Sequence, residues 1–160
     1  MPTIALAALI IVALVATIFV ARALGFLRKR RWIVVDGSNV MYWRDGTPDP
    51  ETVVEVMSAL KKAGFDPCIV FDANAGYLLF GRHANEAGMS GRLGIVKDHI
   101  LVAKSGQPAD PLILSTARDF DCLIVTNDQF RDWVEAYPEV LENGRLVKGR
   151  FVKGSLQFDF

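Results

Sequence analysis

Four short apolar segments of the chain alternate with residue patterns typical of helices, and this alternation restricts the possible folds more than any other feature. The apolar segments are residues 32–35, 67–71, 100–103 and 122–125. Short continuous apolar runs are typical of strands that are buried on both faces. Between them, apolar residues at helical spacing predict helices over 53–63 and 110–120. Strands that alternate with helices form a parallel sheet with helices on both faces, so we predict an α/β domain.

Three further segments complete the predicted order of elements. Glycine residues punctuate residues 73–94, where we expect one or two short helices. A helix is predicted after the fourth strand, from Asp128 through Trp133. Residues 145–160 predict a hairpin that turns at Lys153-Gly154.

The N-terminal segment has a different character. Residues 2–21 carry no charge and are long enough, at about 1.5 Å per residue, to span the ~30 Å hydrocarbon core of a membrane. We therefore predict one transmembrane helix over residues 2–27, followed by a basic juxtamembrane linker over residues 28–31. Because basic residues stay on the cytoplasmic side, we expect residues 32–160 at the cytoplasmic face of the inner or cell membrane. The alternatives are a buried core helix and a cleaved signal peptide, although a signal peptide would carry basic residues before its apolar run.

Charge is distributed unevenly between this segment and the rest of the chain. Residues 32–160 contain 13 of the 18 basic side chains and all 18 acidic ones, so this part is acidic overall. An acidic body excludes a protein that coats nucleic acid through general positive charge. Its length suits one domain with its own core. The two cysteines, Cys68 and Cys122, exclude a disulfide scaffold, and we expect both as small, reduced core residues.

Acidic residues gather at the ends of the predicted strands, where parallel sheets form their binding sites. Asp36 and Asp72 end the first two strands. Asp128 follows the fourth strand, and Asp110 opens the helix before it. Asp132 lies four residues beyond Asp128, on the same face of the predicted helix. Because like charges in one crevice repel one another, a hard divalent cation is expected among them, and we predict a Mg²⁺ or Mn²⁺ site that acts on phosphodiesters.

Each of these acids also has a purely structural interpretation. Asp110 and Asp128 are well placed to cap the helices that follow them. Asp132 would pair with a neighbouring basic side chain, and Asp72 would accept backbone hydrogen bonds in a loop. Asp36 is harder to explain in this way, because a charge that ends a buried strand needs a partner.

Three blocks of the sequence resemble, in the correct order, the signature blocks of NYN-type PIN-like ribonucleases. The blocks are Ile-Val-Val-Asp36-Gly37-Ser38-Asn39-Val, Ala109-Asp110-Pro-Leu-Ile-Leu and Ile-Val-Thr126-Asn127-Asp128-Gln-Phe-Arg131-Asp132. The similarity covers about residues 32–135, and the branch that the chain resembles is that of the Regnase endoribonucleases. The resemblance implies a three-layer α/β sandwich with a mainly parallel central sheet, a Mg²⁺ or Mn²⁺ centre and cleavage of single-stranded RNA. It further implies that the metal-site and catalytic acids are Asp36, Asp110, Asp128 and Asp132, and that Asn39 orients Asp36 by hydrogen bonding.

The chain also departs from the Regnase pattern. That pattern carries paired acids where this sequence has Ala109-Asp110, so one carboxylate is missing. Asp72 has no dependable counterpart in the pattern and is kept as a further candidate. The zinc finger of the animal proteins is absent, because two cysteines cannot build it.

We therefore predict a membrane-anchored, metal-dependent endoribonuclease that occupies residues 32–160 with its catalytic domain. The alternative from another class is a catalytically weak, membrane-tethered RNA-binding or scaffold module of the same fold. The missing acid at Ala109 favours this alternative, whereas the four acids of the signature blocks favour the enzyme. A homo-oligomer is compatible with the sequence.

Because the body is acidic, binding of single-stranded RNA requires a local basic or aromatic patch. The basic candidates, which we expect near the same edge as the acids, are Arg82, His83, Arg92 and Lys97. Tyr42, Trp43 and Arg44 follow the first signature block, and the two rings are candidates for stacking on an unpaired base. The alternatives are an ordinary solvated loop for the basic group and packing against the first helix for the aromatic pair.

Overall fold

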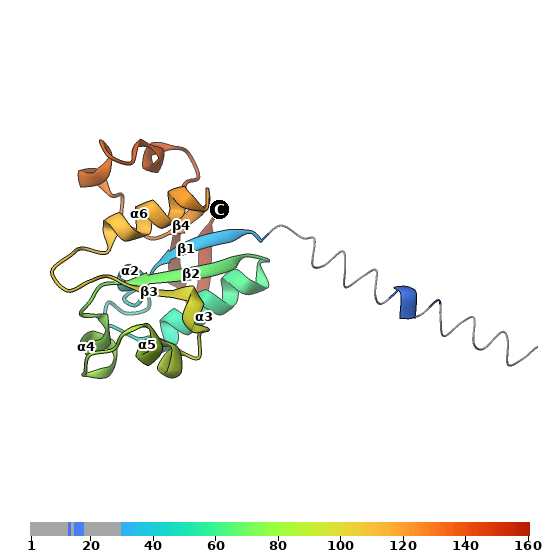
Figure 1. The fold of residues 1–160 in the computed structure, drawn as a ribbon, viewed down its shortest axis with the longest axis horizontal. Coiled ribbons are helices and arrows are strands. Elements are labelled where there is room, and N and C mark those ends of the chain that lie inside the picture. The colour runs from blue at the N-terminus through green and yellow to red at the C-terminus, as the bar shows by residue number, and fades with distance from the viewer. Residues whose placement is uncertain (1–12, 14, 18–29) are drawn as a thin grey trace, which may run out of the picture. The chain divides into compact units, whose positions relative to one another are not determined.

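The apolar segments of the sequence form the strands of one sheet in a computed structural model, which describes residues 13, 15–17 and 30–160. The strands are β1 (Trp32–Asp36), β2 (Asp66–Phe71), β3 (Ile100–Val102), β4 (Leu123–Val125), β5 (Leu146–Val152) and β6 (Ser155–Asp159). Their order in the sheet is β3-β2-β1-β4-β5-β6 (Figure 1). All neighbours are parallel except β5 and β6, which form an antiparallel hairpin.

The direction in which the chain crosses the sheet reverses beside β1. From β1 the chain moves outward to β2 and β3, and it then returns to β4 on the other side of β1. Val35 of β1 accordingly pairs with Ile69 of β2 and with Val125 of β4. Such a switch point opens a crevice at the carboxyl ends of the strands, where α/β sheets bind ligands. Asp36, the last residue of β1, lies at this point.

Helices cover both faces of the sheet and make three layers (Figure 1). One face carries α3 (Pro50–Lys62), α4 (Ala75–Phe80) and α5 (Glu86–Leu93), and the other carries α6 (Asp110–Asp119). The short 3-10 helices η2 (Arg131–Trp133) and η3 (Pro138–Leu141) follow β4 on the α6 side. Because side chains alternate along a strand, Ile33 and Val35 of β1 pack toward α3, whereas Val34 packs toward α6.

Most of the predicted elements are confirmed. The four apolar segments are strands, and the helices predicted over 53–63 and 110–120 correspond to α3 and α6. The glycine-punctuated segment contains the two short helices α4 and α5. The C-terminal hairpin turns at Lys153-Gly154, as predicted. The α/β class with a mostly parallel sheet is therefore confirmed as well.

The helix predicted from Asp128 to Trp133 is wrong, because only the three residues of η2 are helical. The Asp128 carboxylate accepts the backbone N–H of Phe130 at 2.8 Å, and Phe130 has a φ of 49° in the left-handed region. Both features close a turn and prevent a helix from beginning at Asp128. Asp128 and Asp132 therefore do not share a helix face.

The predicted transmembrane helix over residues 2–27 falls, except for residues 13 and 15–17, outside the described residues, as do residues 28 and 29 of the predicted linker. In the part of the chain that is described, no helix has the length and apolar character needed to cross a membrane. The membrane anchor therefore stays a prediction from the sequence.

Candidate active site

A buried carboxylate lies at the switch point of the sheet. Only 6% of Asp36 is exposed to solvent. Its Oδ1 accepts the backbone N–H of Asn39 at 3.1 Å and so caps the short helix α2 (Gly37–Val40). Its Oδ2 accepts the hydroxyl of Thr126 at 2.9 Å. Thr126 directly follows β4, so this bond joins the ends of the two strands that border the crevice.

The electrostatic environment of Asp36 disfavours its negative charge. The pKa of Asp36 is raised to about 6, mainly by burial, and the nearby carboxylates of Asp110 and Asp72 contribute to this rise. The hydrogen bonds from Thr126 and Asn39 act in the opposite direction, because they stabilise the ionised form. A cation beside Asp36 would offset both the cost of burying its negative charge and the repulsion from the neighbouring carboxylates.

Asp72 joins the same site from the end of β2. Its backbone N–H donates to the hydroxyl of Ser38 at 2.8 Å, and its Oδ1 accepts the backbone N–H of Ala109 at 3.0 Å. The first bond ties β2 to the segment after β1, and the second holds the start of α6. The carboxylate that the sequence left as a further candidate thus lies next to Asp36 and Asp110.

Asp110 is the first residue of α6 and is half-buried. Its Oδ2 accepts the indole N–H of Trp133 at 3.0 Å, which orients the carboxylate. Burial raises the pKa of Asp110; the carboxylates of Asp128, Asp72 and Asp132 add to this effect, and the Trp133 bond opposes it. Asp110 has no side-chain capping bond within α6, since the N-cap residue is Ala109. The structure therefore does not support the helix-cap interpretation of Asp110.

Asp128 and Asp132 are both exposed and lie on the segment after β4. The Asp128 carboxylate accepts the backbone N–H of Phe130, and the Asp128 backbone N–H donates to Thr126 Oγ1 at 3.1 Å. The same threonine hydroxyl therefore connects the backbone of Asp128 to the carboxylate of Asp36. Asp132 acts on the charge of Asp110 although the predicted helix is absent.

We call the residues Asp36, Asp72, Asp110, Asp128 and Asp132 the acidic edge. Carboxylate oxygens are the ligands that Mg²⁺ and Mn²⁺ prefer, so the donor set fits such an ion. Among the described residues, no three Asp, Glu, His or Cys side chains are grouped closely enough to hold a metal ion as they stand.

Asn39 contributes in two ways. Its backbone holds Asp36, whereas its side-chain oxygen accepts the indole N–H of Trp43 at 2.8 Å and the backbone N–H of Asn127 at 3.0 Å. The Asn127 side chain in turn bonds both backbone groups of Gly149 in β5. Hydrogen bonding between Asn39 and Asp36 is therefore present through the main chain, and the Asn39 side chain fixes the segment that carries Asp128.

Three residues of this site were missed from the sequence: Thr126, Asn127 and Trp133. Thr126 and Asn127 stand inside the third signature block, directly after an apolar strand, where a hydroxyl or amide reaches the end of the neighbouring strand. This position was the available signal. Trp133 offered none, because its contact with Asp110 depends on the turn that replaces the predicted helix.

The predicted RNA-binding residues separate into three groups. Arg82, His83 and Arg92 border one hollow of about 380 Å³, and His83 also borders a second hollow that reaches Ala73, beside Asp72. Trp43 is occupied by packing: its ring lies against Gly149 and 6.4 Å from the ring of Phe158. Neighbouring Arg44 pairs with acids of the α3 segment and lies over the Phe151 ring, and Tyr42 is exposed.

Lys97 lies at the wrong edge of the sheet for the predicted role. It belongs to the short 3-10 helix η1 (Lys97–His99), which directly precedes β3. The first residue of β3, Ile100, is level with Val35 of β1 through Ile69 of β2, so η1 lies on the side of the strand starts. His99 of η1 contacts these starts: its Nδ1 is 2.9 Å from the Pro67 carbonyl oxygen, and its ring is 5.5 Å from that of Trp32. The expectation that Lys97 lies near the acids is therefore wrong.

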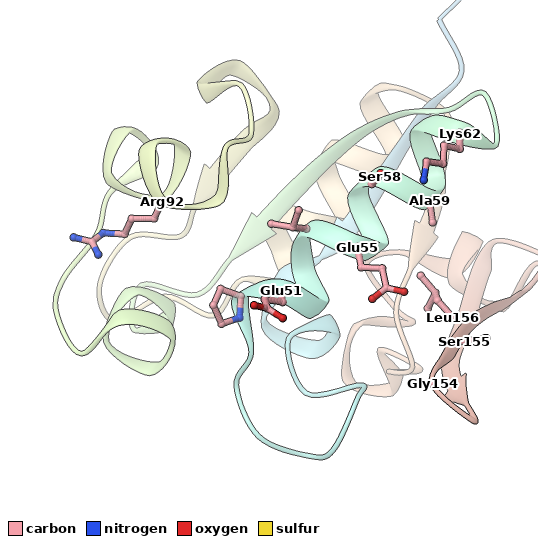
Figure 2. Close-up of a pocket in the computed structure, with 11 residues that line it drawn as sticks. Glu51, Glu55, Ser58, Ala59, Lys62, Arg92, Gly154, Ser155 and Leu156 are labelled. Carbon is pink, nitrogen blue, oxygen red and sulfur yellow. The ribbon is translucent and has the colours of Figure 1, made fainter.

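Another groove lies apart from the acidic edge. It measures about 710 Å³ and runs along α3, where Glu51, Glu55, Ser58 and Lys62 line it. Figure 2 shows the hairpin residues Gly154, Ser155 and Leu156 on one side of this groove and Arg92 on the other. No member of the acidic edge lines it, so its size alone does not mark it as a reaction site.

A doubly wound, mostly parallel sheet with carboxylates at its switch point is consistent with the PIN-like class of α/β domains. The family model described as the Zc3h12a-like Ribonuclease NYN domain matches residues 29–159, so the chain belongs to this family. The resemblance to NYN-type ribonucleases that the three sequence blocks indicated is thereby confirmed. No curated protein matches the sequence.

Two solved structures of nuclear protein-only RNase P 2 (PRORP2) from Arabidopsis thaliana are similar to the chain. Their TM-scores are 0.62 and 0.59, both are 22% identical to it, and the matches cover 86% and 96% of this chain. The same matches cover 31% and 35% of the PRORP2 chains, so this chain spans about a third of their length. At this identity the likeness shows the fold alone, and that fold agrees with the PIN-like class.

Proposed function

We propose that this protein is an endoribonuclease that uses Mg²⁺ or Mn²⁺ at the acidic edge to hydrolyse single-stranded or looped RNA. One observation carries the proposal: at the switch point of the sheet, Asp72 and Asp110 act on the charge of Asp36, and Asp72, Asp128 and Asp132 act on that of Asp110. Membership of a ribonuclease family supports RNA as the substrate. The solved structures of similar fold carry the name RNase P.

The protein's own residues would act mainly by holding and orienting carboxylates. A bound divalent ion supplies neutralising charge and an activated water molecule. Asp36 and Asp128 would hold the main ion, and Asp110 and Asp132 would position a second ion or the attacking water. Thr126 and the Asn39 backbone fix both oxygens of Asp36, and Trp133 fixes one oxygen of Asp110. We expect no covalent intermediate with the protein.

We infer that Asp72 partly replaces the acid that this chain lacks at Ala109. The Asp72 carboxylate accepts the Ala109 N–H, so it lies directly beside the position where the Regnase pattern carries a further acid. It also raises the pKa of both Asp36 and Asp110, and this electrostatic effect supports the inference. Replacement of Asp72 by Asn should therefore reduce cleavage.

The alternative function is a catalytically weak RNA-binding or scaffold module. Two observations favour it: Ala109 stands where the family pattern has an acid, and the described carboxylates form no ready-made ligand cage. The two functions differ in one measurable respect, since a silent module would bind RNA and leave it uncut.

We further propose that residues 2–27 anchor the protein in the inner or cell membrane and that the acidic edge faces the cytoplasm. The support is the uncharged apolar run over residues 2–21 and the basic residues that follow it. Such an anchor would restrict cleavage to RNA that comes close to the membrane surface.

The proposed activity can be tested with the full chain and an end-labelled single-stranded RNA. We expect cleavage in Mn²⁺ or Mg²⁺, none in EDTA, and a loss of at least about a hundredfold for Asp36→Asn. The matched control is Asp98→Asn, an exposed aspartate in η1 at the opposite edge of the sheet, which should cleave like the unchanged chain. A DNA strand of the same sequence tests selectivity for RNA.

Equal decay of the RNA with and without EDTA, or undiminished cleavage by Asp36→Asn, would contradict the metal-dependent nuclease. Tight binding of RNA without cleavage in either metal would favour the silent module instead.

A further inference from the structure

A pocket of about 680 Å³ opens beside the acidic edge, between β3, the loop after it and α6. Its walls are largely apolar: they include Leu101 of β3, Pro111 and Leu112 of α6, and the rings of Trp133 and Tyr137. A few polar side chains, among them Lys104, Gln107 and Ser115, complete the lining. We call this cavity the α6 pocket. Pockets that are mostly apolar with a few polar groups are typical of sites for small molecules and cofactors.

The α6 pocket is directly connected to the acidic edge. Trp133, which forms part of its wall, donates its indole N–H to Asp110 at 3.0 Å. Pro111, another wall residue, follows Asp110 in the sequence. A group inside the pocket would therefore lie next to the carboxylates that act on the phosphate.

A basic side chain lies at the border of the α6 pocket. Lys104 lines this pocket and also a second hollow of about 410 Å³, which is bordered by Tyr77 and His83. Lys104 is exposed, and the α6 pocket contains no acidic side chain. The border thus offers a positive charge to a phosphate beside an apolar cavity.

We propose that the α6 pocket binds the nucleobase of a nucleotide next to the phosphate that is cleaved. This proposal rests on the proposed function, because it assumes that RNA is the molecule at the acidic edge. An acidic body cannot hold RNA by general attraction, so affinity must come from contacts to unpaired bases. Aromatic rings beside a lysine supply such contacts through stacking and a phosphate bond.

The nucleobase is favoured over other occupants by the position of the pocket. The groove along α3 has a similar volume but lies apart from the acidic edge and has no aromatic side chain in its lining, which carries Glu51 and Glu55 as well as Lys62 and Arg92. Of the four cavities described above, the α6 pocket is the one that combines a wall residue bonded to Asp110, aromatic walls and a bordering lysine.

The test uses binding in EDTA, so that cleavage does not enter the measurement. A short fluorescent single-stranded RNA is compared with a series in which each nucleotide in turn lacks its base. With the full chain, loss of one particular base should weaken binding about tenfold, because stacking of a base on aromatic side chains contributes this much. Loss of bases elsewhere should have a smaller effect.

Filling the pocket should abolish that difference. Ser115 is a half-buried α6 residue that lines the pocket, so Ser115→Phe places a ring inside it. The matched control is Ser58→Phe, the same change at a half-buried helix residue that lines the groove along α3 (Figure 2). Gln107→Trp narrows the α6 pocket from an exposed loop position and replaces Ser115→Phe if that variant fails to melt cooperatively.

The proposal is supported if Ser58→Phe keeps the tenfold difference and the pocket-filling variant loses it. It is overturned if no single missing base weakens binding to the unchanged chain, or if the pocket-filling variant retains the full difference. Cleavage in Mn²⁺ is measured separately with the intact RNA. Base recognition without cleavage would contradict the proposed nuclease activity and leave the proposed base-binding pocket supported. Cleavage without base discrimination would contradict the base-binding pocket alone.

Discussion

Asp36 combines burial, hydrogen bonding and repulsion in a single side chain. Both of its oxygens are engaged, yet burial still raises its pKa to about 6. The carboxyl group therefore costs stability when it is ionised in the absence of a cation. Natural proteins retain such costs mainly at functional sites, which agrees with the proposed role for Asp36.

The pH dependence of stability should reveal this cost. Because the folded-state pKa of Asp36 lies above its unfolded value, the folded protein binds more protons, and the free energy of unfolding should fall as pH rises toward and through about 6. In metal-free buffer at about pH 7.5, Asp36→Asn should be more stable than the unchanged chain by about 1–3 kcal/mol. The advantage should shrink toward about pH 4.5, where Asp36 is mostly protonated in the folded state.

Urea unfolding of the full chain at both pH values measures these differences, with Asp98→Asn as the control for the loss of an exposed aspartate. A constant difference at the two pH values would contradict the assignment of this pH dependence to Asp36.

Thr126 is the second residue on which the site depends. Its buried hydroxyl donates to Asp36 and accepts the N–H of Asp128, so Thr126→Val leaves two groups without this partner. The expected loss in the free energy of unfolding is about 1–3 kcal/mol. Thr116→Val, whose hydroxyl bonds only to the Leu112 carbonyl within α6, should cost less. Chemical denaturation of both variants decides the point, and equal losses would argue against a special role for the Thr126 hydroxyl.

At the residue scale, the sequence identified the acids better than their surroundings. Asp36 and Asp110 were found because they follow or precede apolar segments whose placement in a parallel sheet is predictable. The packing of the Trp43 ring inside the protein was not predictable, because its partners Gly149 and Phe158 come from strands far along the chain. Lys97 was misplaced because the irregular stretch before β3 carries no pattern that shows where it crosses the sheet.

Among the elements, β5 supports the acidic edge, because its residue Gly149 contacts both Trp43 and the loop after β4. A Cβ atom on Gly149 would lie 2.1 Å from the Trp43 ring, so only glycine permits this contact. Asn127 bonds to both backbone groups of Gly149, and Asn39 connects Asn127 to Trp43. The strand β5 and the loop after β4 are thus held together beside the acidic edge.

Gly149→Ala should therefore destabilise the protein by about 1–3 kcal/mol, because the added methyl group overlaps the Trp43 ring. The matched control is Gly91→Ala in α5, where an added Cβ meets nothing within 4 Å and alanine favours the helix. Combination of Gly149→Ala with Trp43→Phe, which removes the outer indole ring, should recover part of the loss. Thermal melts of the unchanged chain, both single variants, the double variant and the Gly91→Ala control test this, and additive losses would contradict the steric explanation.

The elements differ in how well their sequence patterns foretold them. Strands β1, β2 and β4 are continuous apolar runs, and α3 and α6 show helical spacing, so local pattern and tertiary position agree. The segment after β4 has helical composition, but the left-handed Phe130 and the Asp128 turn override it. The structure of this segment is determined by tertiary contacts, among them the hydrogen bond from Trp133 to Asp110, which cannot be read from the local sequence.

At the scale of the whole molecule, the proposed membrane anchor makes a prediction about topology. If residues 2–27 span the membrane with residues 28–31 on the cytoplasmic side, alkaline phosphatase fused after Phe160 should stay inactive in a bacterial host, since it requires export. Replacement of the four basic residues 28–31 by Ser should raise its activity by weakening the orientation signal. High activity of the unchanged fusion would contradict the cytoplasmic assignment.

The acidic edge is assembled from the ends of β1 and β2, the start of α6 and the segment after β4, and Thr126 joins two of these parts through its hydroxyl. No short peptide of this protein carries the complete constellation. A designer who wished to transplant the chemistry to another scaffold would have to move the entire sheet with its crossovers, and grafting a single loop would transfer only isolated aspartates.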